Sequence, residues 1–571
     1  MTSATYEQLS KEQLIKLLLE RDIDVEANPH KKKYGLIWEN KPEQFEADSV
    51  GKISVLKRDP AKSIVSSPDG PTHVLIQGDN YHALKVLAYT HERSVDVIYI
   101  DSPYNTGNKD FKYNDKFVDK EDGYRHSKWL SFMAKRLRLA KTLLKDTGAI
   151  FLSIDDNEQA QLKLLCDEIF GQDNFIANIV LKKGRGSQDA LHLKIVHEYA
   201  LMYAKNKSKL RVARNSRTRE ATTSVSLRKT GEGDRKADAP ALHYPIYADP
   251  SSGRIELEPF NGAVEILPVG PGGYESRWRW GKEKFRRENH LLTLAKTRKG
   301  TYDLQSRYAE GSTAVEPFNA LLVDFGAPGG TQLNDILPGN GFKNPKHTVF
   351  VAHLLSMIEG DDLVVLDFFA GSGTTAHAVM QLNAEDGGTR QCILVTNDEG
   401  EFQDEQGNLL DGGICTHVTY PRLTKVIEGY TTPKGKQVAG LAENLVFFDT
   451  EFVEDRALER SRRELTARSA EMLCLRELTF IEEESTDKRW RCFTDGHGKR
   501  LVVVTDAFAA NDLRPLLKAD KRETLVYVFR FGDDEDPARE YVGKGLEHIT
   551  AKPVPDSLLA LHRRIQRQEA A

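Results

Sequence analysis

Short apolar runs alternate with segments of helical spacing between residues 72 and 205. The apolar runs have the length of buried strands, and hydrophobic residues recur every three to four positions in the segments between them. We expect strands at 73–80, 95–104, 148–155, 175–183 and 198–205, and helices at Tyr81–Leu87 and Trp129–Leu144. Strands that alternate with helices predict a mainly parallel, doubly wound α/β sheet.

This alternation stops between about 206 and 340 and then returns. The second α/β stretch has a helix that ends near Met357, a strand at 362–369, a helix that begins at Thr374 and a strand at 391–397. From about residue 441 a highly charged helix precedes strand-like segments at 501–506 and 524–531. The pattern predicts an N-terminal helical appendage (1–45), one half of the sheet domain (46–205), an inserted domain (206–340), the other half of the sheet domain (341–440) and a C-terminal α+β domain (441–571).

The composition is that of a globular protein, with 571 residues of which 39% are hydrophobic and 29% are charged. The apolar runs fall short of the roughly 18 residues of a membrane span, and the N-terminal residues MTSATYEQLSKEQ are too polar for a signal peptide. The five cysteines form no Cys-x-x-Cys pair, which excludes zinc ribbons and disulfide frameworks, and we expect no metal site. Free thiols at this density are typical of a reducing cytoplasm, and we expect the protein to be located there. We expect no membrane partner.

The net charge of −5 hides a strongly basic segment. Eleven lysines and arginines lie between residues 205 and 236, opposed by only three acidic residues. Aromatic residues then interleave with arginines in YESRWRWGKEKFRRENH (274–290), which contains Arg277, Arg279 and Arg286. A solvated charged face is the usual explanation of such a run. The aromatic residues, and the place between two halves of one domain, favour nucleic-acid recognition.

A glycine-rich turn follows the strand expected at 362–369. In DFFAGSGTT (367–375) a buried strand ends, a run of small residues allows a tight turn, and a helix begins. An α/β sheet presents ligands in this way, with a helix N-terminus at the carboxyl end of its strands. The lysine of a phosphate-binding G-x-x-x-x-G-K-[ST] loop is absent, which argues against nucleotide triphosphate hydrolysis. A close packing turn is the structural alternative.

A second motif, Asp101-Ser102-Pro103-Tyr104, ends the strand expected at 95–104. A carboxylate and a backbone carbonyl in a proline-restrained turn accept hydrogen bonds from an exocyclic amine. The Tyr104 ring offers a flat face for a planar base, and such stacking contributes about 1–3 kcal/mol per base in nucleic-acid complexes. An ordinary Asp-Ser-Pro turn is the alternative explanation of this motif.

In this order, and with a basic insert between them, the two motifs resemble those of the β-group amino-methyltransferases of DNA. Among these enzymes the chain resembles the modification subunits of type III restriction–modification systems. The resemblance extends through IQGDNYHALK (76–85), VHEYALMYAK (196–205) and NPKHTVFVAHLL (344–355). It implies a Rossmann-like methyltransferase fold, S-adenosylmethionine as cofactor, double-stranded DNA as substrate, and target recognition by the inserted domain.

The resemblance also assigns roles to residues. Asp101, Ser102, Pro103 and Tyr104 match the catalytic motif. The residues that match cofactor-binding positions are Asp79, Asn80, Lys346, Asp367, Phe369, Ala370, Gly371, Gly373, Thr374 and Glu399, with Asp398 a near alternative to Glu399. Two positions depart from the family. Ser102 replaces a proline, which removes one rigid φ angle from the turn, and His347 replaces the second proline of a Pro-Lys-Pro element, which weakens the match of Lys346 beside the methionine end of the cofactor.

The implied reaction is methylation of N6 of an adenine that is flipped out of the duplex. Hydrogen bonds from the amine to Asp101 and to the Ser102 carbonyl would aim its lone pair at the methyl group, while Tyr104 stacks on the base. Aspartate at the first motif position favours adenine over N4 of cytosine, where the family more often has serine. A cytosine-N4 methyltransferase and a non-catalytic DNA-recognition subunit are the alternatives. The Asn-Pro-Pro-Tyr motif of protein glutamine methyltransferases is absent.

The charged C-terminal helix carries an apolar stripe of Leu458, Leu465 and Met472, spaced seven residues apart. Such a stripe either packs into the core of its own domain or joins two protomers. Because the type III modification subunits are dimeric, we expect a homodimer joined by this region. The sequence has no helicase or nuclease motif, so restriction would require a separate subunit. The resemblance also predicts a bacterial or phage-encoded, nucleoid-associated protein.

Overall fold

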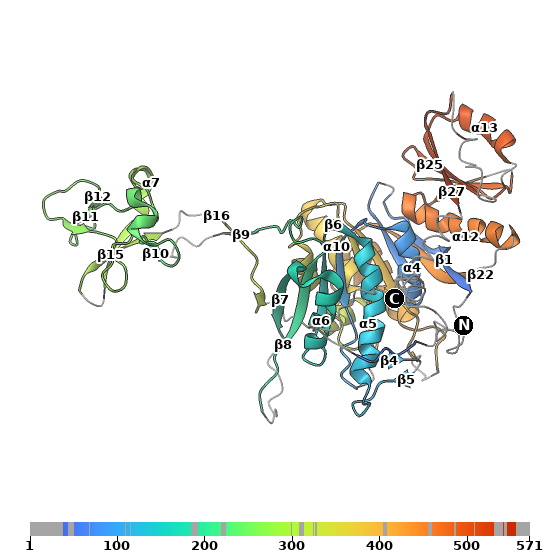
Figure 1. Cartoon of the computed structure of the whole chain (residues 1–571), viewed down its shortest axis with the longest axis horizontal. Helices are drawn as coiled ribbons and strands as arrows, with labels where there is room; N and C mark the ends of the chain where they lie inside the picture. Colours follow the sequence, from blue (N-terminus) through green and yellow to red (C-terminus); the bar gives the residue numbers. More distant parts are fainter. Residues whose placement is uncertain are drawn as a thin grey trace, which may run out of the picture. The chain divides into compact units, whose positions relative to one another are not determined.

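The protein forms two compact units in its computed structural model (Figure 1). Residues 1–212 and 319–571 make up the first unit, and residues 213–318 make up the second. The structure describes residues 38–43, 51–67, 69–108, 110–114, 116–183, 192–218, 224–297, 300–307, 313–323, 325, 328–403, 408–454, 459–484, 487–506, 509–529, 541 and 545–554. Most of the expected appendage at 1–45 therefore lies outside the described residues.

The second unit is shorter than the inserted domain expected at 206–340, because secondary structure on its C-terminal side packs into the first unit. β17 (Leu321–Leu322) pairs in parallel with β7 (Phe175–Lys182) of the main sheet, and α8 (Gly329–Ile336) contacts α11 (Tyr420–Glu428). These two short elements carry no strong sequence pattern, so the boundary could not be placed from the sequence.

The first unit is built on one sheet of ten strands in the order β1-β22-β2-β19-β18-β3-β6-β8-β7-β17. The six consecutive strands from β22 to β6 are parallel to one another, which confirms the predicted mainly parallel α/β sheet, while β1, β8 and β7 are antiparallel to a neighbour. The remaining strands of this sheet are β1 (Lys52–Ile64), β2 (Thr72–Gln77), β3 (Val95–Asp101), β6 (Leu144–Ile154), β8 (His197–Ala204), β18 (Val364–Asp367), β19 (Gln391–Thr396) and β22 (Asn444–Glu454).

Two rows of helices pack against this sheet. One row consists of α4 (Asn80–Thr90), α5 (Arg125–Leu143) and α6 (Gln159–Phe170); the other consists of α9 (Thr348–Leu355), α10 (Thr374–Asp386) and α11. The chain runs from β2 through β3 to β6 in one direction across the sheet, and from β18 to β19 in the opposite direction. Because such crossovers are right-handed, the two rows cover opposite faces. The direction reverses between β18 and β3, and ligands bind at such a switch point in open α/β sheets.

The central strands are largely apolar in their middle because helices cover both of their faces. In β2 the four residues from His73 to Ile76 are all buried, and in β3 the run from Val97 to Ile100 is buried as well. Helix α5 contributes one buried stripe, which includes Trp129, Met133 and Leu137. Because helices bury both faces of the sheet and β3 pairs directly with β18, the carboxyl ends of these two strands lie side by side.

The C-terminal region does not begin a separate domain at residue 441, because β22 is part of the main sheet. Helix α12 (Glu459–Glu477) packs against β1 and α4, and it buries Leu465 and Met472 in the same core as the central strands. The stripe thus packs into its own chain, and its role as a dimer interface was a wrong expectation for these two residues; Leu458 lies outside the described residues. A five-stranded sheet follows, with the helix α13 (Ala510–Ala519) and the strands β23 (Ile481–Glu483), β24 (Trp490–Thr494), β25 (Lys499–Val504), β26 (Glu523–Phe529) and β27 (Ile549–Val554).

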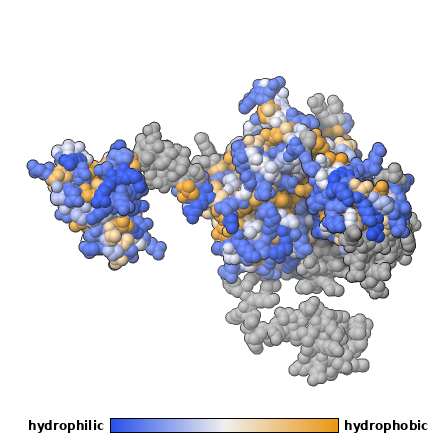
Figure 2. Space-filling model, turned by 90° about the horizontal axis from the view of Figure 1, so that it is seen from above, coloured by the Kyte–Doolittle hydropathy of each residue, from blue (hydrophilic) through white to orange (hydrophobic). Residues whose placement is uncertain are grey.

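The second unit has its own small core. Trp278, Trp280 and Phe285 are buried there, whereas the intervening Arg277 is half-buried and Arg279 is exposed. The aromatic residues of the basic segment therefore stabilise the unit, while Arg279 lies at its surface and Arg277 donates to the Gly233 carbonyl at 2.6 Å. Hydrophilic residues cover most of the visible face of this unit (Figure 2). Its elements are β9 (Asn215–Thr218), β10 (Ser224–Ser226), β11 (Ile246–Ala248), β12 (Ile255–Glu256), β13 (Val264–Ile266), α7 (Lys282–Glu288), β14 (Leu292–Lys296), β15 (Tyr302–Arg307) and β16 (Thr313–Glu316).

Candidate active site

Two sequence motifs meet where neighbouring strands end. β3 ends at Asp101 and β18 ends at Asp367, and these two parallel strands are paired directly. The segment Ser102–Tyr104 leaves the first strand, and the glycine-rich turn leaves the second. The switch point of the sheet thus brings together both motifs that the sequence singled out.

The glycine-rich turn needs glycine at two positions. Gly371 and Gly373 have φ angles of 48° and 77°, which side chains strongly disfavour. A Cβ at Gly373 would also lie 3.3 Å from Cγ2 of Thr419. The hydroxyl of Thr419 donates a hydrogen bond to the Gly371 carbonyl at 2.5 Å, and so holds the turn from the other side.

Asp367 braces this turn and does not line the cavity described below. Its carboxyl accepts hydrogen bonds from the Phe369 backbone N–H at 2.9 Å and from the Thr375 hydroxyl at 2.5 Å. The residue is buried, and burial raises the pKa of its carboxyl to about 7 even though both hydrogen bonds favour the charged form. Ala370 and Thr374 also lie outside the cavity lining, and the Thr374 hydroxyl donates to the Lys346 carbonyl at 3.2 Å.

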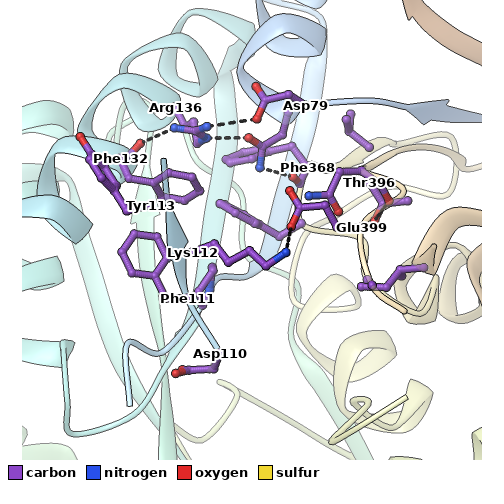
Figure 3. Close-up of a pocket in the computed structure, with 18 of the residues that line it drawn as sticks. Asp79, Asp110, Phe111, Lys112, Tyr113, Phe132, Arg136, Phe368, Thr396 and Glu399 are labelled. Carbon is purple, nitrogen blue, oxygen red and sulfur yellow. Dashed lines mark hydrogen bonds and ion pairs between the residues drawn. The ribbon is translucent and has the colours of Figure 1, made fainter. Parts of the chain in front are cut away.

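A cavity of about 670 Å³ opens beside the turn. Of the expected cofactor residues, the cavity lining includes Asp79, Asn80, Phe369, Gly371 and Glu399, together with Asp101 and Pro103 of the second motif. Further lining comes from aromatic side chains such as Phe111, Tyr113 and Phe132 (Figure 3). Its size and its mixture of aromatic and carboxylate groups suit a polar ligand with a planar ring.

One wall of the cavity is the hairpin of β4 (Lys112–Tyr113) and β5 (Lys116–Phe117). From this hairpin the Lys112 ammonium reaches the Glu399 carboxylate at 3.0 Å (Figure 3). The neighbouring Asp398 instead accepts hydrogen bonds from the backbone N–H and the hydroxyl of Thr416, at 2.8 and 2.7 Å. Of these two neighbouring acidic residues, Glu399 lines the cavity and Asp398 does not.

Asp79 and Asn80 are held by a buried arginine that sequence reasoning missed. Asp79 caps α4 by accepting hydrogen bonds from the N–H groups of Tyr81 and His82. Arg136 donates to Asn80 Oδ1 at 2.6 Å, lies 3.4 Å from Asp79 Oδ2, and forms an ion pair with Glu43 at 3.0 Å. A sequence signal did exist, because Arg136 follows the buried Trp129 and Met133 at helical spacing and so falls on the buried face.

The second motif forms a compact polar cluster. The Tyr104 hydroxyl lies 3.0 Å from Asp101 Oδ1 and 3.2 Å from Glu198 Oε2. The Lys346 ammonium donates to Asp101 Oδ1 at 2.8 Å and to the Tyr104 hydroxyl at 2.7 Å. Lys346 thus lies in this cluster and is not among the cavity-lining residues. Glu198 was missed, since a lone glutamate in an apolar strand gives no signal of what it faces.

The electrostatics of this cluster keep its lysine charged and its tyrosine neutral. Burial by itself lowers the pKa of Lys346, but the carboxylates of Asp101 and Glu198 outweigh it, and the pKa lies above its ordinary value. Burial and the same two carboxylates raise the pKa of Tyr104 well above its ordinary value. The tyrosine hydroxyl therefore remains a hydrogen-bond donor at neutral pH.

The turn between Asp101 and Tyr104 is restrained despite the serine at position 102. The Ser102 hydroxyl is buried and donates to the Ser153 carbonyl at 3.3 Å. The indole N–H of Trp129 donates to the Pro103 carbonyl at 2.7 Å. These two hydrogen bonds hold the turn where the family has a second proline.

An α/β fold with a ligand-sized cavity and an Asp-Ser-Pro-Tyr turn at one switch point defines a class of protein, the Rossmann-like methyltransferases. Residues 95–402 match the family described as DNA methylase (N6_N4_Mtase). Type II methyltransferase M.KpnI of Klebsiella pneumoniae is 35% identical, over 58% of this chain and 82% of that protein. The EcoPI Mod subunit of Escherichia phage P1, from a type III restriction-modification enzyme, is 30% identical over 74% of this chain and 72% of that protein. The StyLTI Mod subunit of Salmonella typhimurium, also from a type III enzyme, is 31% identical over 67% of this chain and 63% of that protein.

The chain belongs to the DNA methylase family, and it is an S-adenosylmethionine-dependent DNA methyltransferase. Among the described residues, helices that are both long and apolar enough to cross a bilayer are absent.

Proposed function

We propose that the protein methylates N6 of adenine at a specific sequence in double-stranded DNA. The observation that carries this proposal is the position of Asp101, which lines the cofactor-sized cavity and also belongs to the Tyr104 cluster. A methyl donor in the cavity and a base at Tyr104 would therefore meet at one carboxylate.

The cavity residues fit S-adenosylmethionine. Glu399 would accept hydrogen bonds from the ribose hydroxyls, in place of its ion pair with Lys112. Phe111, Tyr113 and Phe132 offer apolar faces to the adenine ring, and the carboxylate of Asp79 adds negative charge that suits a cationic ligand. When bound, the cofactor supplies a methyl group activated by its sulfonium.

The chain's own residues orient the acceptor. The target amine is a poor nucleophile because its lone pair is delocalised into the ring. Asp101 and the Ser102 carbonyl would accept its two N–H groups and direct the lone pair out of the ring plane. Tyr104, with its hydroxyl anchored on Asp101 and Glu198, would present its ring to the extruded base.

Adenine is favoured over cytosine because of the aspartate at the first motif position. The family more often has serine there in cytosine-N4 enzymes, so that activity is the alternative. A non-catalytic recognition subunit is disfavoured, because the hydrogen bonds of Ser102 and Trp129 keep the catalytic turn in place.

The second unit would recognise the DNA target. Arg279 and Arg286 are exposed and Arg277 is half-buried, so all three are candidates for phosphate or base-edge contacts. Because two relatives are named as Mod subunits of type III restriction-modification enzymes, we also propose a separate restriction subunit as partner. We retain the homodimer as a proposal. Sedimentation at micromolar concentration tests it, with a mass near twice 64.3 kDa expected and a persistent monomer against it.

Methylation-sensitive sequencing of DNA from a host that expresses the protein tests the function. Methylated adenines within one recurring sequence are expected, and they should disappear in a host that expresses Asp101→Ala. Methylated cytosines at a recurring sequence would establish the alternative, and unmodified DNA would contradict the proposal.

A further inference from the structure

The buried carboxylate of Glu198 contacts Tyr104 of the catalytic motif and has no role assigned so far. Glu198 lies on β8, and its side chain is 2% exposed. Burial of a carboxylate is costly unless the charge is paired and hydrogen-bonded. Its Oε2 atom contacts three groups among the described residues: the Tyr104 hydroxyl at 3.2 Å, Lys346 Nζ at 3.6 Å and the Lys183 ammonium in an ion pair.

The Lys346 ammonium lies beside the two groups that the proposed reaction assigns to the target base, Asp101 and Tyr104. Its ammonium donates to Asp101 Oδ1 at 2.8 Å, and Nζ lies 4.9 Å from the centroid of the Tyr104 ring. In the proposed reaction, an N–H of the target base donates to Asp101 and the base lies against Tyr104. The ammonium and the target amine would therefore meet at one carboxylate and one ring, with the ammonium and the Tyr104 hydroxyl both on Oδ1 of Asp101.

The Tyr104 hydroxyl links the two carboxylates. Tyrosine has a single hydroxyl hydrogen, so Tyr104 donates to either Asp101 or Glu198 at any moment. Lys346 lies within 4 Å of both carboxylates, since its Nζ is 2.8 Å from Asp101 and 3.6 Å from Glu198. A short movement of the ammonium would exchange one carboxylate for the other.

We propose that Glu198 is a positioning residue that receives the Lys346 ammonium when the target amine takes its place at Asp101. This inference rests on the proposed methylation of adenine. It explains why a second carboxylate is buried beside Asp101, and why both bond the same tyrosine.

Steady-state kinetics of Glu198→Gln test the proposal. Without the second carboxylate, Lys346 remains on Asp101, and the KM for DNA should rise about tenfold while cofactor affinity changes less than about twofold. Lys346→Met in the Glu198→Gln background removes the competing ammonium and should bring the KM for DNA back toward the wild-type value. The matched control is Tyr199→Phe on the same strand, which removes a hydroxyl that bonds Asp156 at 2.8 Å.

Three outcomes overturn the inference: an unchanged KM in Glu198→Gln, an equal loss of cofactor and DNA binding, or a double variant as impaired as the single one. If Glu198→Gln does not fold, Glu198→Asp decides, because it keeps the charge at a shorter reach. An intermediate rise in the KM for DNA is then expected, and no rise contradicts the inference. Wild-type protein that fails to methylate adenine would instead refute the proposed function.

Discussion

Nε of Arg136 donates a hydrogen bond to Oδ1 of Asn80 at 2.6 Å, and this bond decides which way the Asn80 amide faces. With its oxygen held, the Asn80 amide nitrogen donates to the Phe368 carbonyl at 2.9 Å, next to the glycine-rich turn. A residue of α5 thereby links the end of β2 to the end of β18 across the cofactor cavity.

Arg136→Met should therefore weaken cofactor binding as well as the fold. The substitution removes the closer partner of Glu43 and leaves it the Lys135 ammonium at 3.8 Å, so the cost should be at most the roughly 3–5 kcal/mol of folding free energy of a broken buried pair. We expect a lower melting temperature and at least a roughly tenfold higher Kd for S-adenosylmethionine, by calorimetry on the folded protein. Arg138→Met is the control, because Arg138 on the same helix is 49% exposed and meets Glu168 only at 4.0 Å. Equal cofactor affinity in the two variants would contradict the role of Arg136.

Gly373→Ala should weaken cofactor binding by more than its loss of stability explains. The φ angle of 77° and the close approach to Thr419 both oppose a side chain. Gly387→Ala provides a matched control, since Gly387 at the other end of α10 has a φ of 75° with open space around it. Both variants should lose about 1–2 kcal/mol of stability, but only Gly373→Ala should bind the cofactor more weakly. The idea fails if both variants bind equally well.

The stability of the protein should carry a pH signature of Asp367. Burial raises the folded-state pKa of its carboxyl to about 7, above the value of about 3.9 in an unfolded chain. Between these values the folded protein holds a proton that the unfolded chain has released, so the stability from this group is present below about pH 4 and is lost as the pH rises toward 7. Asp367→Asn cannot titrate. The melting temperature of this variant, relative to that of the wild type, should therefore rise between pH 5 and pH 8. A constant difference across this range would refute the raised pKa of Asp367.

Replacement of Arg277, Arg279 and Arg286 by alanine should weaken DNA binding and leave cofactor affinity intact. Each lost phosphate contact should reduce the slope of log affinity against log salt by about 0.9. A charge-matched control replaces the exposed Lys434, Lys436 and Lys518 of the first unit. Fluorescence anisotropy at several salt concentrations measures both, and unchanged DNA affinity in the arginine variant would place recognition elsewhere.

The central sheet could be predicted because its strands are buried on both faces and therefore read as continuous apolar runs, as β2 and β3 do. β1 could not be predicted in this way. It is an edge strand with many charged residues and Pro60, which an edge tolerates because one side of the strand has no partner. β22 was assigned to the wrong domain because its place in the sheet depends on partners far away in sequence.

The candidate site could be predicted where its residues are consecutive in the sequence, as in Asp101-Ser102-Pro103-Tyr104 and the glycine-rich turn. Glu198 and Lys346 join that motif only through the fold, since they are separated from Asp101 by many residues. Asp367 shows the converse. It belongs to a recognisable motif, but its carboxyl is used to brace the turn, and only its hydrogen-bond partners reveal this.

Transfer of tritium from labelled S-adenosylmethionine to duplex DNA, followed by hydrolysis and separation of the bases, shows directly which base Asp101 presents to the cofactor. Wild-type protein should place the label on N6-methyladenine. Asp101→Ala should bind the cofactor with near wild-type affinity and transfer almost none. Label recovered on N4-methylcytosine, or normal transfer by Asp101→Ala, would contradict the account of this site.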